Sequence, residues 1–213
     1  MATTGTMLVR EVVTAALRKL NITNVGDDPD AEDAELAMTA LNRMLKAWQN
    51  RGYNVWAVSQ LSVTLTTAAS YVMSPVRPLR ILGARFSRNG VEIPMQVMTR
   101  DEYDMLPQKL STGTPTTYYY DRQREAAKLY VWPVLTVAAG EVLNITYERE
   151  TDDITSLDQV LDLPGEYFDA AVYGLAARLS DDYQRDVPQI VARAEEELRI
   201  ALAFDREESV FFR

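Results

Sequence analysis

Apolar residues recur every three or four positions at both ends of this chain, whereas between the ends they alternate with polar residues. The first two stripes comprise Val9, Val13, Ala16, Leu17 and Leu20, then Ala34, Ala37, Leu41, Met44, Leu45 and Trp48. Two more comprise Phe168, Ala171, Val172, Leu175, Leu179 and Tyr183, then Val191, Ala194, Leu198, Ala201 and Leu202. A helix gathers residues at this spacing on one face. The pattern therefore predicts two amphipathic helical hairpins, near residues 6–50 and 163–206.

The middle of the chain has the two-residue period that is typical of strands. Leu61, Val63 and Leu65 alternate with serine and threonine, which suits a half-buried sheet. Asn89-Gly90 separates two apolar runs and predicts a hairpin, because both central residues of a type I′ turn need a positive φ. Further strands are predicted over residues 79–87, 91–98, 116–120, 128–132 and 142–147, with a short helix within residues 99–109.

These patterns predict an α+β fold: a four-helix bundle from the N- and C-terminal helical hairpins, with an inserted antiparallel β-sandwich or barrel lobe. The predicted bundle domain comprises residues 1–55 plus 151–213, and the inserted β-rich domain comprises residues 56–150. Residues 151–162 are acidic and polar, which predicts a linker, and residues 207–213 are expected to be a C-terminal extension. Each hairpin has an apolar stripe that needs cover, so the two ends of the chain are expected to pack together.

Composition narrows the range of functions. The 213 residues are 47% apolar and 25% charged, as in an ordinary folded protein. The chain has no cysteine and no histidine, which removes thiolate nucleophiles, imidazole bases and most zinc or iron chemistry. No run approaches the roughly 18 apolar residues of a membrane span, and the first residues do not resemble a secretion signal. We therefore expect a protein that is not an enzyme, has no cofactor or metal and does not contact a membrane.

The net charge of −9 comes from one part of the chain. Residues 151–213 carry 6 basic and 15 acidic side chains, whereas residues 1–55 carry 6 and 7, and residues 56–150 carry 10 and 9. An acidic surface gains no affinity from neutralising phosphates. DNA that passes near this surface is expected to be repelled rather than bound.

Several groups of side chains are candidates for chemistry, and each also has a structural interpretation. They are Asp152-Asp153, Asp181-Asp182 and Glu195-Glu196-Glu197; Asp27, Asp28 and Asp30; Arg77, Arg80, Arg85 and Arg88; and Tyr118, Tyr119, Tyr120, Tyr130 and Trp132. Acid pairs could serve a glycosidase or a two-metal nuclease, but neighbouring acids on a helix mostly point to different faces. The three aspartates lack the spacing of a calcium loop, which favours helix capping. The arginines could bind a polyanion and the tyrosines could stack on sugars or bases, but nearby acids and sheet packing favour structural roles.

Several segments of the chain resemble the head-to-tail adaptors of short-tailed bacteriophages, the tail tubular protein A and tail accessory factor group. The likeness lies in residues 9–22 (VREVVTAALRKLNI), 40–52 (ALNRMLKAWQNRG) and 163–171 (LPGEYFDAA) of the helical parts. In the strand-rich part it lies in residues 78–81 (PLRI), 114–120 (TPTTYYY) and 129–133 (LYVWP), which are similar to the inserted lobe of the larger members.

This resemblance implies a virion protein that is made in the host cytoplasm and assembles as a ring of twelve copies. The ring would join the portal to the tail nozzle and line the DNA channel, through which DNA passes without sequence-specific binding. The inserted lobe would contact nozzle or tail fibre proteins. In that family the C-terminal segment docks on the portal, which implies portal contact by Ser209, Val210, Phe211, Phe212 and Arg213.

Two other functions remain open from the residues alone. One is a carboxylate-based hydrolase of cell-wall glycans that uses Asp181 or Asp182 with an aromatic groove on the β-rich part. The other is a carbohydrate- or fibre-binding tail module centred on residues 118–120.

Overall fold

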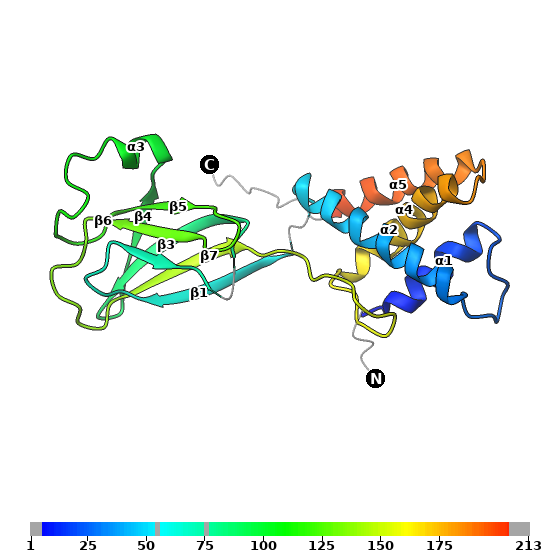
Figure 1. Ribbon diagram of the computed structural model, residues 1–213, viewed down its shortest axis with the longest axis horizontal. Coiled ribbons are helices and arrows are strands. Elements are labelled where there is room, and N and C mark those ends of the chain that lie inside the picture. Colours follow the sequence, from blue (N-terminus) through cyan, green and yellow to red (C-terminus); the bar gives the residue numbers. More distant parts are fainter. Residues whose placement is uncertain (1–5, 54–55, 75–76, 205–213) are drawn as a thin grey trace, which may run out of the picture. The chain divides into compact units, whose positions relative to one another are not determined.

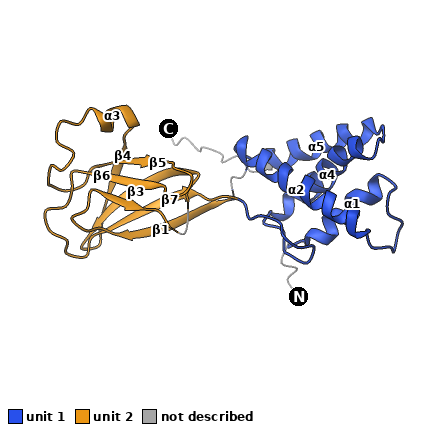
Figure 2. Cartoon of the chain, in the orientation of Figure 1, with its two compact units in different colours: residues 1–56, 151–213 blue, residues 57–150 orange. Residues whose placement is uncertain are grey.

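The computed structural model describes residues 6–53, 56–74 and 77–204 (Figure 1). It divides the chain into two compact units, one of Met1–Trp56 with Thr151–Arg213 and one of Ala57–Glu150 (Figure 2). The first unit is helical and the second contains all seven strands found among the described residues. The expected α+β class is therefore confirmed.

The helical unit is organised around one helix, α4 (Phe168–Asp182), which follows the 3-10 turn Gly165–Tyr167. Helices α1 (Val9–Lys19), α2 (Ala31–Asn50) and α5 (Pro188–Phe204) all pack against it. Seven α4 residues are buried: Ala170, Ala171, Val172, Leu175, Ala176, Leu179 and Ser180. Small side chains let the neighbouring helices approach closely, and the Gly174 Cα faces the Met44 sulfur and the Trp48 ring.

Contacts along the helices fix their directions. The Tyr183 hydroxyl, just after α4, donates a 2.6 Å hydrogen bond to Asp33 near the start of α2. Trp48, near the end of α2, packs against Tyr167 just before α4, with ring centroids 6.3 Å apart. Helix α2 is therefore antiparallel to α4. The short turn between α4 and α5 makes these two helices antiparallel as well, so α2 and α5 end at the same end of the unit. Both helices flank α4 with a groove between them, and a closed four-helix bundle is not confirmed.

Residues 151–163 form part of the helical unit and are not a linker, which corrects the expectation from their polar composition. Their apolar residues Ile154, Leu161 and Leu163 belong to the helical core. The Asn42 side chain holds Ile154 by two hydrogen bonds, donating to its carbonyl at 2.9 Å and accepting from its N–H at 2.8 Å. Backbone hydrogen bonds from Val9 and Arg10 to the carbonyls of residues 159 and 157 attach the same segment to the start of α1.

The second unit is a single sheet with the strand order β1-β7-β3-β4-β5-β6-β2. The strands are β1 (Val58–Thr64), β2 (Ser70–Val72), β3 (Arg80–Arg88), β4 (Val91–Val97), β5 (Thr117–Asp121), β6 (Lys128–Trp132) and β7 (Val142–Glu148). The expected hairpin joins β3 to β4, with Asn89 and Gly90 at φ of 53° and 78°. Helix α3 (Arg100–Asp104) confirms the expected short helix, and Thr99 and Glu102 cap it reciprocally.

The sheet is curled, because side chains from distant strands share one core. Leu129 of β6 and Leu143 of β7 belong to the same buried cluster, although β3, β4 and β5 lie between their strands in the sheet order. In a flat sheet strands four positions apart would be roughly 19 Å apart. The five residues 65–69 join the two edge strands β1 and β2, and Leu65 among them is buried in this core.

The structure does not confirm a sandwich or barrel, and the expectation of a purely antiparallel lobe is wrong. Strands β4 and β5 pair in parallel, with Gln96 opposite Thr117 and Val97 opposite Tyr118. The chain between them passes through α3 and residues 105–116, a connection long enough to return the chain to the same end of the sheet before β5 begins.

A buried carboxylate stabilises one end of this sheet. Glu141 is 4% exposed and accepts hydrogen bonds from the Ala139 N–H at 2.7 Å and from the Arg88 Nε at 3.0 Å. These contacts lower the pKa of Glu141, chiefly through the backbone hydrogen bonds from Ala139 and from its own N–H, with a further contribution from Arg88. None of the helices in the described ranges is long and apolar enough to cross a lipid bilayer.

We predict that Asn42→Ala lowers the free energy of unfolding by ~1–3 kcal/mol, because it leaves both backbone groups of the buried Ile154 without partners. Urea unfolding followed by helical circular dichroism measures the loss, and deuterium uptake should rise in peptides covering residues 152–158. The matched control is Asn50→Ala, since Asn50 is exposed at the end of the same helix. Equal stability of the two variants would contradict the role of Asn42.

We predict that Glu141 makes the stability of the β unit depend on pH. Because its pKa in the folded protein lies below the ordinary 4.5, its contribution is complete above that value and is lost as pH falls through the lowered pKa. Urea midpoints measured from about pH 5.5 to about pH 3 should fall less steeply in Glu141→Gln than in the parent chain. The exposed Glu125→Gln serves as the control and should keep the parent slope.

Candidate functional site

The tyrosines that could form a stacking platform are largely enclosed by one another. Tyr103 of α3 and Tyr119 of β5 stack with ring centroids 5.3 Å apart, and Tyr119 stacks on Tyr130 of β6 at 5.7 Å. Tyr119 is 8% exposed and Tyr118, on the opposite face of the strand, is 3% exposed. Burial raises the pKa of both phenols. The rings of Tyr103, Tyr119 and Tyr130 therefore attach α3 to the sheet and Tyr118 fills its core, which favours a structural role over stacking on a sugar or a base.

The arginines of the first hairpin and its surroundings are each paired with a glutamate of the same unit. Arg77 contacts Glu150 at 2.9 Å, and Arg85 and Arg88 contact Glu92 and Glu141 at 3.0 Å each. Arg80 forms a fourth ion pair, with Glu148. Because each positive charge has a carboxylate beside it, this surface has little free charge with which to attract a polyanion.

The acidic clusters of the helical unit do not converge into a catalytic pair. Asp181 and Asp182 are exposed neighbours in the last turn of α4, and Glu195 is exposed on α5. Glu197 pairs with Arg193 at 2.7 Å and Asp153 pairs with Lys46 at 3.0 Å. Among the described residues no group of three or more acids is arranged to hold a metal ion. The geometry does not favour hydrolysis by Asp181 or Asp182.

The aspartates before α2 line a shallow polar hollow together with Asn24 and Asp33. Asp30 is the N-cap residue of α2, although its side chain makes no capping hydrogen bond. Asp33 instead accepts from the Tyr183 hydroxyl, and burial together with this bond raises the pKa of Tyr183. The hydrogen bond between Tyr183 and Asp33 therefore connects the end of α4 to the start of α2. The aspartates around the hollow do not form a calcium loop.

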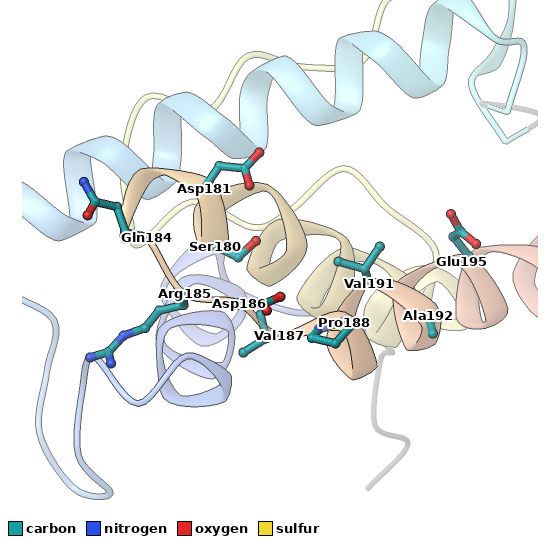
Figure 3. Close-up of a pocket in the computed structure, with 10 residues that line it drawn as sticks. All are labelled: Ser180, Asp181, Gln184, Arg185, Asp186, Val187, Pro188, Val191, Ala192 and Glu195. Atoms are coloured by element: carbon teal, nitrogen blue, oxygen red, sulfur yellow. The ribbon is translucent and has the colours of Figure 1, made fainter.

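A concave surface runs between α2 and α5 over α4, and we call it the α2–α5 groove. Its first part is lined by Met44, Trp48, Arg51, Gly174, Ala177, Arg178, Ser180, Asp181, Val191, Ala194, Glu195 and Leu198. It continues into a hollow of about 660 Å³ at the turn between α4 and α5, with which it shares Ser180, Asp181, Val191 and Glu195. In Figure 3 Asp181 and Glu195 lie on different helices and the Arg185 side chain points away from both.

Two cations of the groove lack a carboxylate partner. Neither Arg51 nor Arg178 forms an ion pair or a side-chain hydrogen bond within the described ranges, whereas Arg10, Lys46 and Arg193 all do. Burial, and then the neighbouring charge of Arg51, lower the pKa of Arg178. An apolar groove with two unpaired guanidinium groups is suited to a segment that carries both apolar and acidic side chains.

Sequence reasoning did not find this groove, because its walls come from residues more than a hundred positions apart. The apolar residues Met44, Trp48, Val191 and Leu198 were visible as parts of two stripes, but nothing in the stripes shows which helices are neighbours. The expected portal-contacting residues Ser209, Val210, Phe211, Phe212 and Arg213 lie outside the described residues.

The chain was compared with known families and structures. The family model described as SU10 adaptor protein matches residues 7–209. None of the curated proteins matches the chain. Sixteen chains of solved structures match it. Among them is a chain from the neck of an empty GTA particle computed with C6 symmetry, at 15% identity and a TM-score of 0.31, with 87% of each chain covered. At that score the likeness supports no functional inference.

We predict that Tyr119→Ala destabilises the β unit by ~3–5 kcal/mol, because it removes one of three tyrosine rings that all contact one another. Urea unfolding measures the change. Val97→Ala is the control, since Val97 is 68% exposed on the neighbouring strand and its truncation should cost less than about 0.5 kcal/mol. A Tyr119→Ala variant that kept the parent stability but lost binding to a glycan array would favour the stacking platform instead.

Proposed function

The chain belongs to the SU10 adaptor protein family, and we propose on that basis that it is a structural component that joins the head of a phage particle to its tail. The observation that carries this proposal is the extent of the family match, which covers residues 7–209 and thus spans both units. The family supports a phage head-to-tail adaptor, a virion component and a non-enzymatic structural protein. It does not single out the tail tubular protein A group.

In finer detail, we propose that the helical unit forms the body of a ring of twelve copies that joins the portal to the tail nozzle. An apolar side chain of α5 outside the groove is available for contacts between copies, since Ile200 is 49% exposed. Contacts in a closed ring are heterologous, so a patch on one copy must meet a different patch on the next. The α2–α5 groove and the outer face of α5 are two such different surfaces.

The charge of the helical part supports a channel through which DNA passes without being held. Residues 151–213 carry 15 acidic and 6 basic side chains. Carboxylates that face a channel repel the phosphates of DNA, so the DNA does not bind the channel wall. The paired arginines of the β unit provide no strong site for DNA either, and we propose that this unit contacts nozzle or fibre proteins.

We further propose that residues 209–213 contact the portal. Phe211 and Phe212 are large aromatic side chains that follow the charged residues 205–208. Aromatic residues inserted into a partner's pocket contribute a large part of the binding energy at protein interfaces. The flanking acidic residues of the segment keep it soluble until it meets that pocket.

We predict that the full-length protein forms a ring-sized complex with its portal, which size-exclusion chromatography with light scattering measures directly. The variant Phe211→Ala/Phe212→Ala should weaken this assembly by about thirtyfold or more, because it removes both aromatic anchors. Val25→Ala is the matched control, since Val25 is 92% exposed in the helical unit and lies far from the segment in sequence.

Two results would contradict the proposal. If no ring-sized complex forms at any ratio of the two proteins, the adaptor function is wrong. If the Phe211→Ala/Phe212→Ala variant assembles as well as Val25→Ala, the proposal of a ring is not contradicted, but residues 209–213 are not the portal contact.

A further inference from the structure

The α2–α5 groove is an open apolar surface with a defined floor and two walls. Gly174 and Ala177 of α4 form the floor, and both are only half-buried although their neighbours Leu175 and Ala176 are buried. On the α2 side, Met44 and Trp48 line the groove but are only 1% and 3% exposed, so its accessible apolar wall is formed by Val191 and Leu198 of α5. Val191 is 42% exposed. Such an exposed apolar strip favours an occupant that covers it.

Charge defines the chemistry of this occupant. Arg51 follows the end of α2 and lies at one end of the groove, while Asp181 lies near the end of α4 and thus at the opposite end. Arg178 faces Arg51 closely enough for the two charges to repel, and neither has an acidic partner in the described part of the chain. An occupant that enters beside Arg51 should therefore carry carboxylates where it enters and can carry a cation farther in.

The chain itself enters at that end. Helices α2 and α5 are both antiparallel to α4, so Asn50 and Phe204 end at the same end of the helical unit. Residues 205–213 follow Phe204 directly. They read DREESVFFR, with Asp205, Glu207 and Glu208 first, then an apolar run and finally Arg213. The acidic residues of this segment complement the guanidinium groups of Arg51 and Arg178, and its apolar run suits the apolar part of the groove lining.

The length of this segment is sufficient. Along α5 the distance from Phe204 back to Leu198 is about 9 Å, and the groove extends roughly 15 Å farther to Pro188 at the helical rise. Nine residues in extended conformation span about 30 Å. A segment that leaves α5 and turns back can therefore reach every residue of the groove without unwinding the helix.

We propose that in the free subunit residues 205–213 dock into the α2–α5 groove of their own chain. Glu207 and Glu208 pair with Arg51 and Arg178, and Phe211 and Phe212 cover the half-buried Gly174, Ala177 and Leu198. The groove is thus an interaction surface for a peptide with acidic residues before an aromatic pair. This inference needs no portal and stands apart from the proposed adaptor function, so either can fail without the other.

The absence of cysteine from the chain permits a direct cross-linking test on the full-length protein. The pair Ala194→Cys/Val210→Cys places one thiol in the groove and one in the docked segment. Glu196→Cys/Val210→Cys is the matched control, because Glu196 is exposed at nearly the same level of α5 but lies outside the groove. Under mild oxidation we expect the groove pair to form its disulfide about tenfold faster or more, owing to the higher effective concentration of a docked segment.

Charge-reversal variants provide a second test of the proposed docking. Arg51→Glu/Arg178→Glu in the groove-pair background should slow cross-linking to the rate of the control pair, and adding Glu207→Lys/Glu208→Lys should restore it. Equal rates for the groove and control pairs would overturn the proposal. Disulfide-linked dimers whose yield rises with protein concentration would overturn it as well, because they would place the segment in the groove of a second copy.

Discussion

The structure depends on the need to cover helix α4 on several sides. Its buried residues, from Ala170 to Ser180, face α1, α2 and α5, so no single helical hairpin can enclose it. Two of the covering helices come from the beginning of the chain and one follows α4 directly. The ends of the chain must therefore meet before either is stable, and the strands between them must form a unit of their own. Residues 151–163 complete the closure by binding α1 and α2 at once.

The regular elements were predictable, because local side-chain patterns determine them. The stripes containing Leu41 and Leu175 and the alternation around Leu61 each report which face of an element is buried. Asn89-Gly90 determined a hairpin because few residue pairs tolerate that turn. The short strand β2 was missed, since three residues carry no period. The parallel pairing of β4 with β5 was missed because register between distant segments leaves no local pattern.

The candidate site was less predictable than the fold. Residues 151–162 were expected to be a linker because their sequence is polar, yet side chains of α2 about a hundred positions away hold this segment: Asn42, Lys46 and Gln49 all form hydrogen bonds with its backbone. The structural role expected for the tyrosines agrees with the stacking of Tyr103 on Tyr119, although the sequence did not show that Tyr103 takes part. The groove that holds Arg51 and Arg178 arises only when α2 and α5 flank the same helix. The chain belongs to an adaptor family, and an adaptor works through contacts with other proteins.

The central claim is that the joined ends of the chain form a self-sufficient helical body. Strands β1 and β7 are paired, with Val58 opposite Glu148, so the inserted unit leaves and returns at adjacent points. Residues 57–150 can therefore be replaced by a short glycine-serine bridge, and circular dichroism during thermal unfolding then gives the direct test. We expect a helical spectrum and one cooperative transition. A spectrum without helix, or a gradual loss of signal without a transition, would contradict the account.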